Sequence, residues 1–309
     1  MKISVAMATY KGAGFVVEQM ESIRTQTRAV DEVIICDDRS PDQTAEVIEK
    51  YISEHHLEGS WHLEVNPENL GYASNFIGAL KKTTGDLIFF CDQDDIWLPN
   101  RVAEMEAIMT ENQGILLLGS EFEPFSDSSD ALEVPKWELK QQKNDKSLEK
   151  KSFCAPNIFI GSQGCTMCMR RELLDRIMDY WYPGWAHDEF VWKLALCLDG
   201  LYMYHAYTLR RRLHSANASL NKMHRLETRV KFLEELIRSH EATLAFAKAH
   251  GLDRKKIKLL EQNVKATKMR VALLRDKKYL NTVKLLFGYS HCYHKKRSIP
   301  VELFMAMKQ

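Results

Sequence analysis

Three carboxylates, Asp92, Asp94 and Asp95, follow one apolar segment, and their spacing is that of a cation site. Residues 87–91 are apolar without alternation, which is typical of a parallel strand covered on both faces. The acidic side chains would then lie at the carboxyl edge of a buried strand, where open α/β sheets bind ligands. Carboxylates this close raise one another's pKa, and a divalent cation removes that cost. The usual occupant of such a cluster is Mg²⁺ or Mn²⁺, shared with substrate phosphates.

A plainer interpretation is a solvated acidic loop before a helix that starts near Asn100, because acidic residues favour a helix N-terminus. The remaining chain favours the cation site. Asp37 and Asp38 end a second apolar strand at 33–36. A second pair of carboxylates is therefore expected at the same sheet edge.

The elements that must position these side chains alternate between strand and helix. This alternation predicts an α/β fold with a doubly wound, mostly parallel sheet and right-handed crossovers. The expected strands are 2–8, 33–36, 61–65 and 87–91, and the expected helices are 15–25, one from Pro41 to about 54, and one that includes Asn75.

Further along, residues 115–119 are expected to continue the sheet, and residues 126–151 are polar enough to predict a mobile surface loop. A small-residue turn at 161–167 should lead into a strand and a helix that begins at Arg171. A helix ending near 198 should carry Asp188 close to its N-terminus, and residues 201–212 should be β structure.

Composition limits the function classes. Hydrophobic residues make up 45% and charged residues 28%, as in a globular protein, and the net charge of +1 argues against a general nucleic-acid binder. No apolar run reaches about 18 residues, so we expect a cytoplasmic protein with reduced thiols. Cys165 and Cys168 have the spacing of half a zinc site, but nothing in the sequence completes it.

The character of the sequence changes near Lys222, from where helical spacing continues to the end. Between Arg254 and Arg297 there are 14 Lys or Arg against 2 Asp or Glu, with aromatic residues interspersed. Such a segment suits peripheral association with the anionic inner face of a membrane, and the alternative is a solvated helix pair packed on the core. We therefore expect a catalytic domain over 1–220 and a basic helical region over 221–309.

Seven short motifs, taken together, identify a family. The chain resembles a bacterial family 2 glycosyltransferase of the GT-A fold, with the rhamnosyltransferase-like enzymes of surface polysaccharide assembly as the nearest subgroup, over residues 1 to about 220. The motifs are, in order, Ala-Thr-Tyr10, Asp-Asp-Arg-Ser40, Asn69-Leu-Gly-Tyr-Ala-Ser-Asn75, Asp-Gln-Asp-Asp-Ile-Trp97, Gly164-Cys-Thr-Met, His-Asp188 and Arg212-Leu-His-Ser-Ala-Asn217.

The resemblance implies a set of donor contacts. Asp94 would bind the metal of a DxD motif, together with His214. Asp92 would face the ribose, whereas Asp95 is expected only to cap the following helix. Asn75 would contact the nucleotide or brace its own helix. The implied nucleotide-binding residues are Ala8, Thr9, Tyr10, Asp38, Asn75 and Asp92.

The resemblance also implies a catalytic base, Asp188, which would take the acceptor's proton in an inverting transfer. Glu189 is adjacent but would point about 100° away on a helix. Trp185 would offer an apolar face to the acceptor sugar or pack in the core, and Arg212 would meet the diphosphate. The pair Glu189-Phe190 stands where aromatic residues commonly follow His-Asp in the family, and this departure leaves the acceptor open.

The implied activity is transfer of a sugar from a UDP- or dTDP-linked donor to a growing cell-surface polysaccharide or lipid-linked oligosaccharide, with Mg²⁺ or Mn²⁺. Two alternatives belong to other classes: a sugar nucleotidyltransferase, and a non-catalytic sugar-binding protein on the same fold. Asp92, Asp94 and Asp188 argue against the second alternative, because a binding protein would not need a base. A dinucleotide enzyme is weakened because Val17 stands at the third glycine position of that fingerprint.

Overall fold

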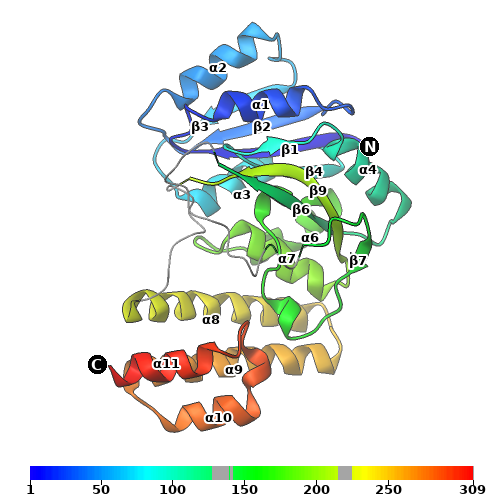
Figure 1. Cartoon of the computed structure of the whole chain (residues 1–309). Helices are drawn as coiled ribbons and strands as arrows, with labels where there is room; N and C mark the ends of the chain where they lie inside the picture. Colours follow the sequence, from blue (N-terminus) through cyan, green and yellow to red (C-terminus); the bar gives the residue numbers. More distant parts are fainter. Residues whose placement is uncertain (127–138, 140–141, 215–224, 309) are drawn as a thin grey trace. The chain divides into compact units, whose positions relative to one another are not determined.

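A computed structural model describes residues 1–126, 139, 142–214 and 225–308 of the chain. The chain forms two compact units. The first comprises Met1–Lys151, Ser162–Ala195 and Gly200–Asn217, and the second comprises Ser152–Gly161, Leu196–Asp199 and Ala218–Gln309 (Figure 1).

Four parallel strands form one half of the sheet in the first unit. Their order is β3 (Trp61–Val65), β2 (Glu32–Asp37), β1 (Ile3–Thr9) and β4 (Leu87–Asp92). In this register Ala8 pairs with both Cys36 and Asp92, and Thr9 pairs with Asp37. The acidic ends of β2 and β4 therefore flank the end of β1, and the expectation that these carboxylates share one sheet edge is confirmed.

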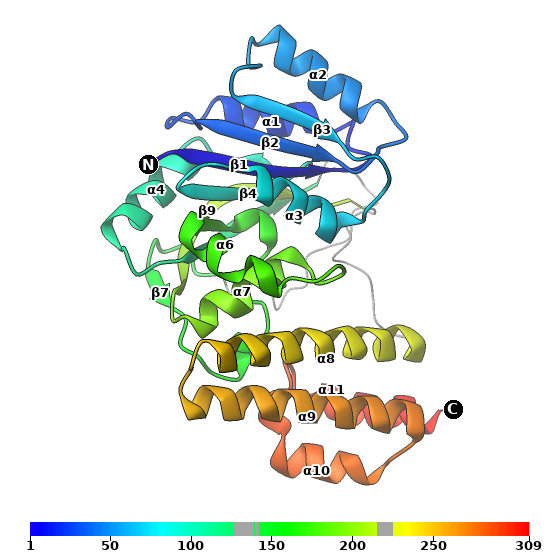
Figure 2. The same cartoon turned by 180° about the vertical axis from the view of Figure 1, so that it is seen from behind.

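Helices cover both faces of this half-sheet, as the sequence pattern predicts. Apolar residues of α1 (Val16–Arg24), α2 (Thr44–Glu54) and α4 (Arg101–Glu111) join one cluster with alternate residues of β1, β2 and β4. On the opposite face lies α3 (Tyr72–Lys82), where Phe76 packs on Phe90 with ring centroids 5.1 Å apart (Figure 2). Burial on both faces is why these strands are apolar without alternation.

The other half of the sheet is mixed. β8 (Cys168–Arg170) lies antiparallel between β4 and β6 (Leu117–Phe125), so the segment near 115–119 does not extend the parallel half directly. β9 (Leu201–Arg212) is parallel to β6 and antiparallel to β5 (Ile96–Trp97) and β7 (Leu148–Lys150). The α/β class is thus confirmed, with parallel pairing confined to β3-β2-β1-β4 and β6-β9 in the described part of the chain.

Two further helices of this half are α6 (Arg171–Ile177) and α7 (His187–Cys197). The surface loop expected at 126–151 contains β7, while 127–138 and 140–141 lie outside the described residues. Short 3₁₀ helices occur at Pro156–Ile158, Gly164–Thr166, Met178–Tyr180 and Ser290–Cys292.

The second unit is helical and has its own apolar core. It contains α8 (Leu226–Ala249), α9 (Arg254–Asp276), α10 (Leu280–Gly288) and α11 (Ser298–Met307). The buried Glu302 carboxylate pairs with Arg229 at 2.6 Å and Arg270 at 2.7 Å, so this charge is compensated inside the helical core. Among the described residues, no helix combines the length and apolar character needed to cross a membrane.

Candidate active site

The turns that follow β1 and β2 are held together by Asp37. Its Oδ2 accepts hydrogen bonds from Thr9 Oγ1 at 2.7 Å and from Ser40 Oγ at 2.6 Å. The Ser40 hydroxyl in turn accepts from the backbone N–H of Lys11 at 2.9 Å. Thr9, a predicted nucleotide contact, therefore has its hydroxyl engaged in fixing the two turns.

Asp38 and Asn75 form a second buried network at the same edge. The Asp38 carboxylate accepts from the backbone N–H groups of Leu70 at 2.7 Å and Gly71 at 2.8 Å, and from Asn66 Nδ2 at 3.0 Å. Asn75 Nδ2 donates to the Cys36 carbonyl at 2.8 Å, and its Oδ1 accepts from Asn66 Nδ2 at 2.8 Å. These side chains brace the loop before α3, so a nucleotide contact through them remains a prediction.

Gln93 ties the Tyr10 turn to the acidic loop, a role that the sequence did not reveal. Its Nε2 donates to the Tyr10 carbonyl at 2.9 Å, and its Oε1 accepts from the Tyr10 N–H at 2.8 Å. A glutamine between two aspartates carries no spacing signal for this pairing. Gly12 leaves the room it needs, because a Cβ there would collide with the Gln93 side chain.

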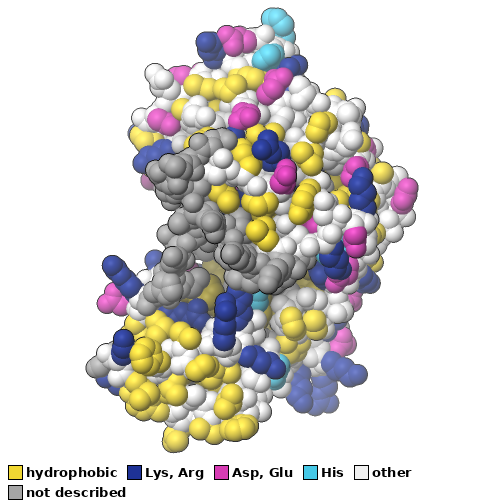
Figure 3. All heavy atoms as spheres, in the orientation of Figure 1, with side chains coloured by type: hydrophobic (Ala, Val, Ile, Leu, Met, Phe, Trp, Pro, Cys, Tyr) yellow, Lys and Arg dark blue, Asp and Glu magenta, His cyan; other side chains and the backbone are white. Residues whose placement is uncertain are grey.

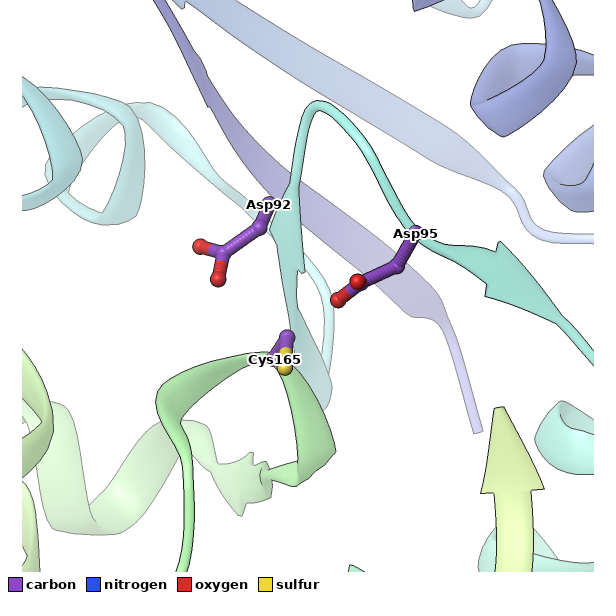
Figure 4. Close-up of side chains that lie close together, drawn as sticks. All are labelled: Asp92, Asp95 and Cys165. Carbon is purple, nitrogen blue, oxygen red and sulfur yellow. The ribbon is translucent and has the colours of Figure 1, made fainter. Parts of the chain in front are cut away.

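Cys165 joins the carboxylates of Asp92 and Asp95, a neighbour that the sequence did not reveal. Their ligand atoms lie within 4.8 Å of one another, and Figure 4 shows the two carboxylates beside the Cys165 thiol. Burial and the charge of Asp94 raise the pKa of Asp95 to about 7. Burial, followed by the charges of Asp95 and Asp94, raises the pKa of Asp92 well above its ordinary value, and Asp188 adds to the effect.

The expectation that Asp95 caps the next helix is wrong. α4 begins at Arg101 after Asn100, and β5 lies between Asp95 and that helix. Asp95 instead turns inward: its Oδ1 accepts from the Arg212 N–H at 3.1 Å, and its buried Oδ2 has no N–H or O–H donor among the described residues.

The two predicted metal ligands are in contact. His214 Nε2 lies 2.7 Å from Asp94 Oδ2, and the His214 ring stacks on Phe15 with centroids 5.0 Å apart. Arg212 is buried beside them, with its Nε donating to the Asp94 carbonyl at 2.9 Å and its guanidinium paired with Glu18. Arg212 therefore holds the acidic loop in place in this structure, and its predicted diphosphate contact remains untested.

The residues present fit a hard divalent cation. The donor set is dominated by carboxylate oxygens, which Mg²⁺ and Mn²⁺ prefer. The buried Oδ2 of Asp95 lacks an N–H or O–H donor within the described part of the chain, and burial together with mutual repulsion raises the pKa of the Asp92 and Asp95 carboxyls. A positive ion would relieve both costs.

Asp188 is the second residue of α7, and its surroundings favour a proton acceptor. Burial raises its pKa to about 6, although its Oδ1 accepts from the Glu189 N–H at 2.7 Å. The preceding His187 stacks on Phe76 with centroids 3.8 Å apart, and burial lowers its pKa to about 3, so this imidazole is neutral. Gly164 permits the approach, because a Cβ there would lie 2.7 Å from His187 Nε2.

Glu189 and Trp185 are occupied in packing around α7. Glu189 Oε1 lies 2.5 Å from the Nζ of Lys193, a lysine only 1% exposed. Trp185 is 2% exposed, stacks on Tyr182 and meets Phe190 edge-on. In this structure its ring supports the start of α7 and offers no open face, so its predicted acceptor contact remains a prediction.

Known proteins resemble this chain in sequence and in fold. The family model described as "Glycosyl transferase family 2" matches residues 4–178. Poly(ribitol-phosphate) beta-N-acetylglucosaminyltransferase TarS of Staphylococcus aureus (strain Mu50) is 32% identical over 120 residues, which are 38% of this chain and 20% of TarS. The match thus spans about a fifth of that relative.

Two solved structures show the same fold. The crystal structure of S. aureus TarS 1-349 in complex with UDP-GlcNAc has a TM-score of 0.63 at 18% identity, covering 100% of this chain and 92% of that chain. Mannosyltransferase PcManGT from Pyrobaculum calidifontis in complex with GDP-Man and Mn²⁺ has a TM-score of 0.53 at 16% identity, covering 99% of this chain and 86% of that chain. These likenesses confirm the expected GT-A fold.

Proposed function

The chain belongs to glycosyl transferase family 2, and on that premise we propose that it transfers a sugar from a nucleotide diphosphate sugar to an acceptor hydroxyl with inversion. One observation carries the proposal. The sheet edge of the first unit carries a carboxylate cluster suited to a cation, and α7 brings a separate carboxyl, Asp188, near enough to act on Asp92; its pKa of about 6 suits a general base.

The chain's own residues have distinct roles in this proposal. Asp94 and His214, with Asp92 and Asp95 beside them, would hold Mg²⁺ or Mn²⁺ and, through the ion, the donor's diphosphate. The ion would neutralise the charge that grows on the diphosphate as the sugar leaves. Asp188 would take the proton of the attacking hydroxyl on the opposite face of the sugar. Its carboxylate is mostly ionised above about pH 6 and is held by the Glu189 N–H.

The relatives support a proposal for the donor and acceptor classes. We propose a UDP- or dTDP-linked sugar, because the TarS structure is a complex with UDP-GlcNAc, and a cell-surface polymer or its lipid-linked precursor as acceptor, because TarS is named for poly(ribitol-phosphate). The seven sequence motifs favour a rhamnosyltransferase-like subgroup. A lipid-linked acceptor would bring the enzyme to the cytoplasmic face of the membrane.

A panel of nucleotide sugars, screened by thermal shift with and without Mn²⁺, tests the proposal. A donor at about 100 times its Kd stabilises a folded protein by about 2.7 kcal/mol. The true donor should therefore raise the melting temperature more than the other nucleotide sugars do. With that donor and an acceptor hydroxyl, release of the nucleoside diphosphate is expected. Pyrophosphate release from a nucleoside triphosphate and a sugar phosphate would instead show a nucleotidyltransferase.

A further inference from the structure

The last two helices of the second unit, α10 and α11, expose large apolar side chains to solvent. On α10, Leu285 is buried, while Leu280 and Phe287 are 79% and 83% exposed on the opposite face, with Val283 between them. A surface helix ordinarily turns its polar face outward. On α10 the exposed face carries Leu280, Val283 and Phe287 instead.

α11 repeats the pattern. Its buried positions Ile299, Glu302 and Ala306 recur at helical spacing and face the core of the unit. The opposite side presents Val301, Phe304 and Met307 to solvent. An apolar surface built from two adjacent helices marks a binding surface rather than scattered exposure. In Figure 3 apolar side chains gather over the part of the surface where α10 and α11 lie.

The charges around this surface are predominantly positive, with one exposed acid, Asp276, at its edge, 3.9 Å from the Lys278 ammonium. Residues 277–308 contain seven Lys or Arg and a single acidic residue, Glu302, which is buried and paired. Lys284 shares the outer side of α10 with the apolar residues, and the Lys308 ammonium lies 4.8 Å from the Phe304 ring centroid. The exposed cations of the segment are Lys277, Lys278, Lys284, Lys296, Arg297 and Lys308.

From this combination we infer that the outer face of α10 and α11 docks the enzyme on an anionic lipid bilayer. Apolar side chains would enter the boundary between headgroups and acyl chains, and the lysines would reach the anionic headgroups. A second copy of the chain is a poorer occupant, because a self-complementary interface would bring the cations of two such surfaces together with only Asp276, at the edge of each, to offset them. This inference identifies the residues that would contact the membrane. It rests on the proposed function only for the identity of that membrane.

Vesicle flotation of the full chain tests the inference, without donor or acceptor. We expect flotation with phosphatidylcholine vesicles that contain phosphatidylglycerol, weaker flotation with phosphatidylcholine alone, and loss of binding between about 0.1 M and about 1 M salt. Leu280→Ser with Phe287→Ser should lower the partition coefficient about tenfold or more. Both side chains are in solvent, so thermal unfolding of this variant should match the unmodified chain.

Matched charge variants locate the surface. Replacing Lys277, Lys278 and Lys284 by Gln should weaken binding to anionic vesicles by about tenfold or more, as in the serine variant. The control replaces Arg254, Lys255 and Lys258 by Gln, which removes the same charge from the start of α9. Its affinity for the vesicles should change less than about twofold. Equal losses in both triple variants, or undiminished flotation of the serine variant, would overturn the docking face. The inference would also be overturned if the chain did not bind vesicles and instead formed a dimer that the two serine substitutions disrupt. Thermal shift with the nucleotide sugar is measured in parallel, so failure of the membrane inference is distinguishable from failure of the proposed transferase activity.

Discussion

Asp188→Asn should slow catalysis and at the same time stabilise the protein. Asparagine keeps the shape of the side chain and can still accept from the Glu189 N–H, but it cannot take a proton. Turnover should fall by roughly 10² to 10⁴, while affinity for the nucleoside diphosphate should be nearly unchanged. A merely structural carboxylate would lose activity and stability together.

The gain in stability follows from the raised pKa. The pKa of the Asp188 carboxyl is about 6 in the folded chain against an ordinary value of 3.8, because burial disfavours its charge. The folded state therefore binds this proton more tightly than the unfolded state, and the charge costs stability once the pH rises above the unfolded pKa. A shift of this size corresponds to about 3 kcal/mol at most, and partial exposure of the group reduces the figure to about 1 to 2 kcal/mol.

Denaturant unfolding of the two proteins across pH checks this reasoning. The asparagine variant should be more stable at about pH 7.5, and the difference should shrink as the pH falls through about 6 and vanish only below about pH 3, where the carboxyl is protonated in both the folded and the unfolded chain. In the unmodified enzyme the rate should fall over the same acidic range, as the base becomes protonated.

Glu189→Gln is the matched control and should give the opposite pattern. It weakens the partner of the buried Lys193 ammonium, so it should cost stability, by about 1 to 3 kcal/mol, and change turnover little. A reversed order of turnover in the two variants would make Glu189 the base. Full activity in both would refute the assignment of a base on α7.

Three other substitutions probe the metal, the base and the donor turn. Asp94→Ala should abolish the Mn²⁺-dependent part of nucleoside diphosphate binding in calorimetry; unchanged metal-dependent affinity would rule out this ligand. Gly164→Ala places a Cβ 2.7 Å from His187 Nε2 and 3.3 Å from the Asp188 Cβ, so turnover should fall about tenfold or more while diphosphate affinity changes less than about twofold. Gln93→Leu removes both hydrogen bonds to Tyr10 and should weaken nucleoside diphosphate binding about tenfold, and an unaltered isotherm would show that the turn holds its shape without them.

The amino-acid pattern was sufficient to predict the class of fold and the sheet edge that carries the candidate site. Apolar runs without alternation specify strands buried on both faces, and their order with the intervening helices specifies a doubly wound sheet. Parallel strands place their carboxyl ends at one edge. The succession of strands along the chain was therefore enough to predict that Asp37, Asp38 and Asp92 share the edge at which β1 ends. Likewise, the expected start of α7 put Asp188 near a helix N-terminus.

Which side chains reach the carboxylate cluster depends on long-range packing that the local sequence does not show. Asp95 has the sequence of a helix cap, yet the insertion of β5 against β9 turns it inward toward Cys165, a residue 70 positions away in the chain. Local propensity cannot reveal this, because the cap and the buried position differ only through long-range strand pairing. The outward apolar face of α10 was equally hidden: helical spacing gives the stripe, but which side of the helix meets the core depends on how α9 and α11 pack against it.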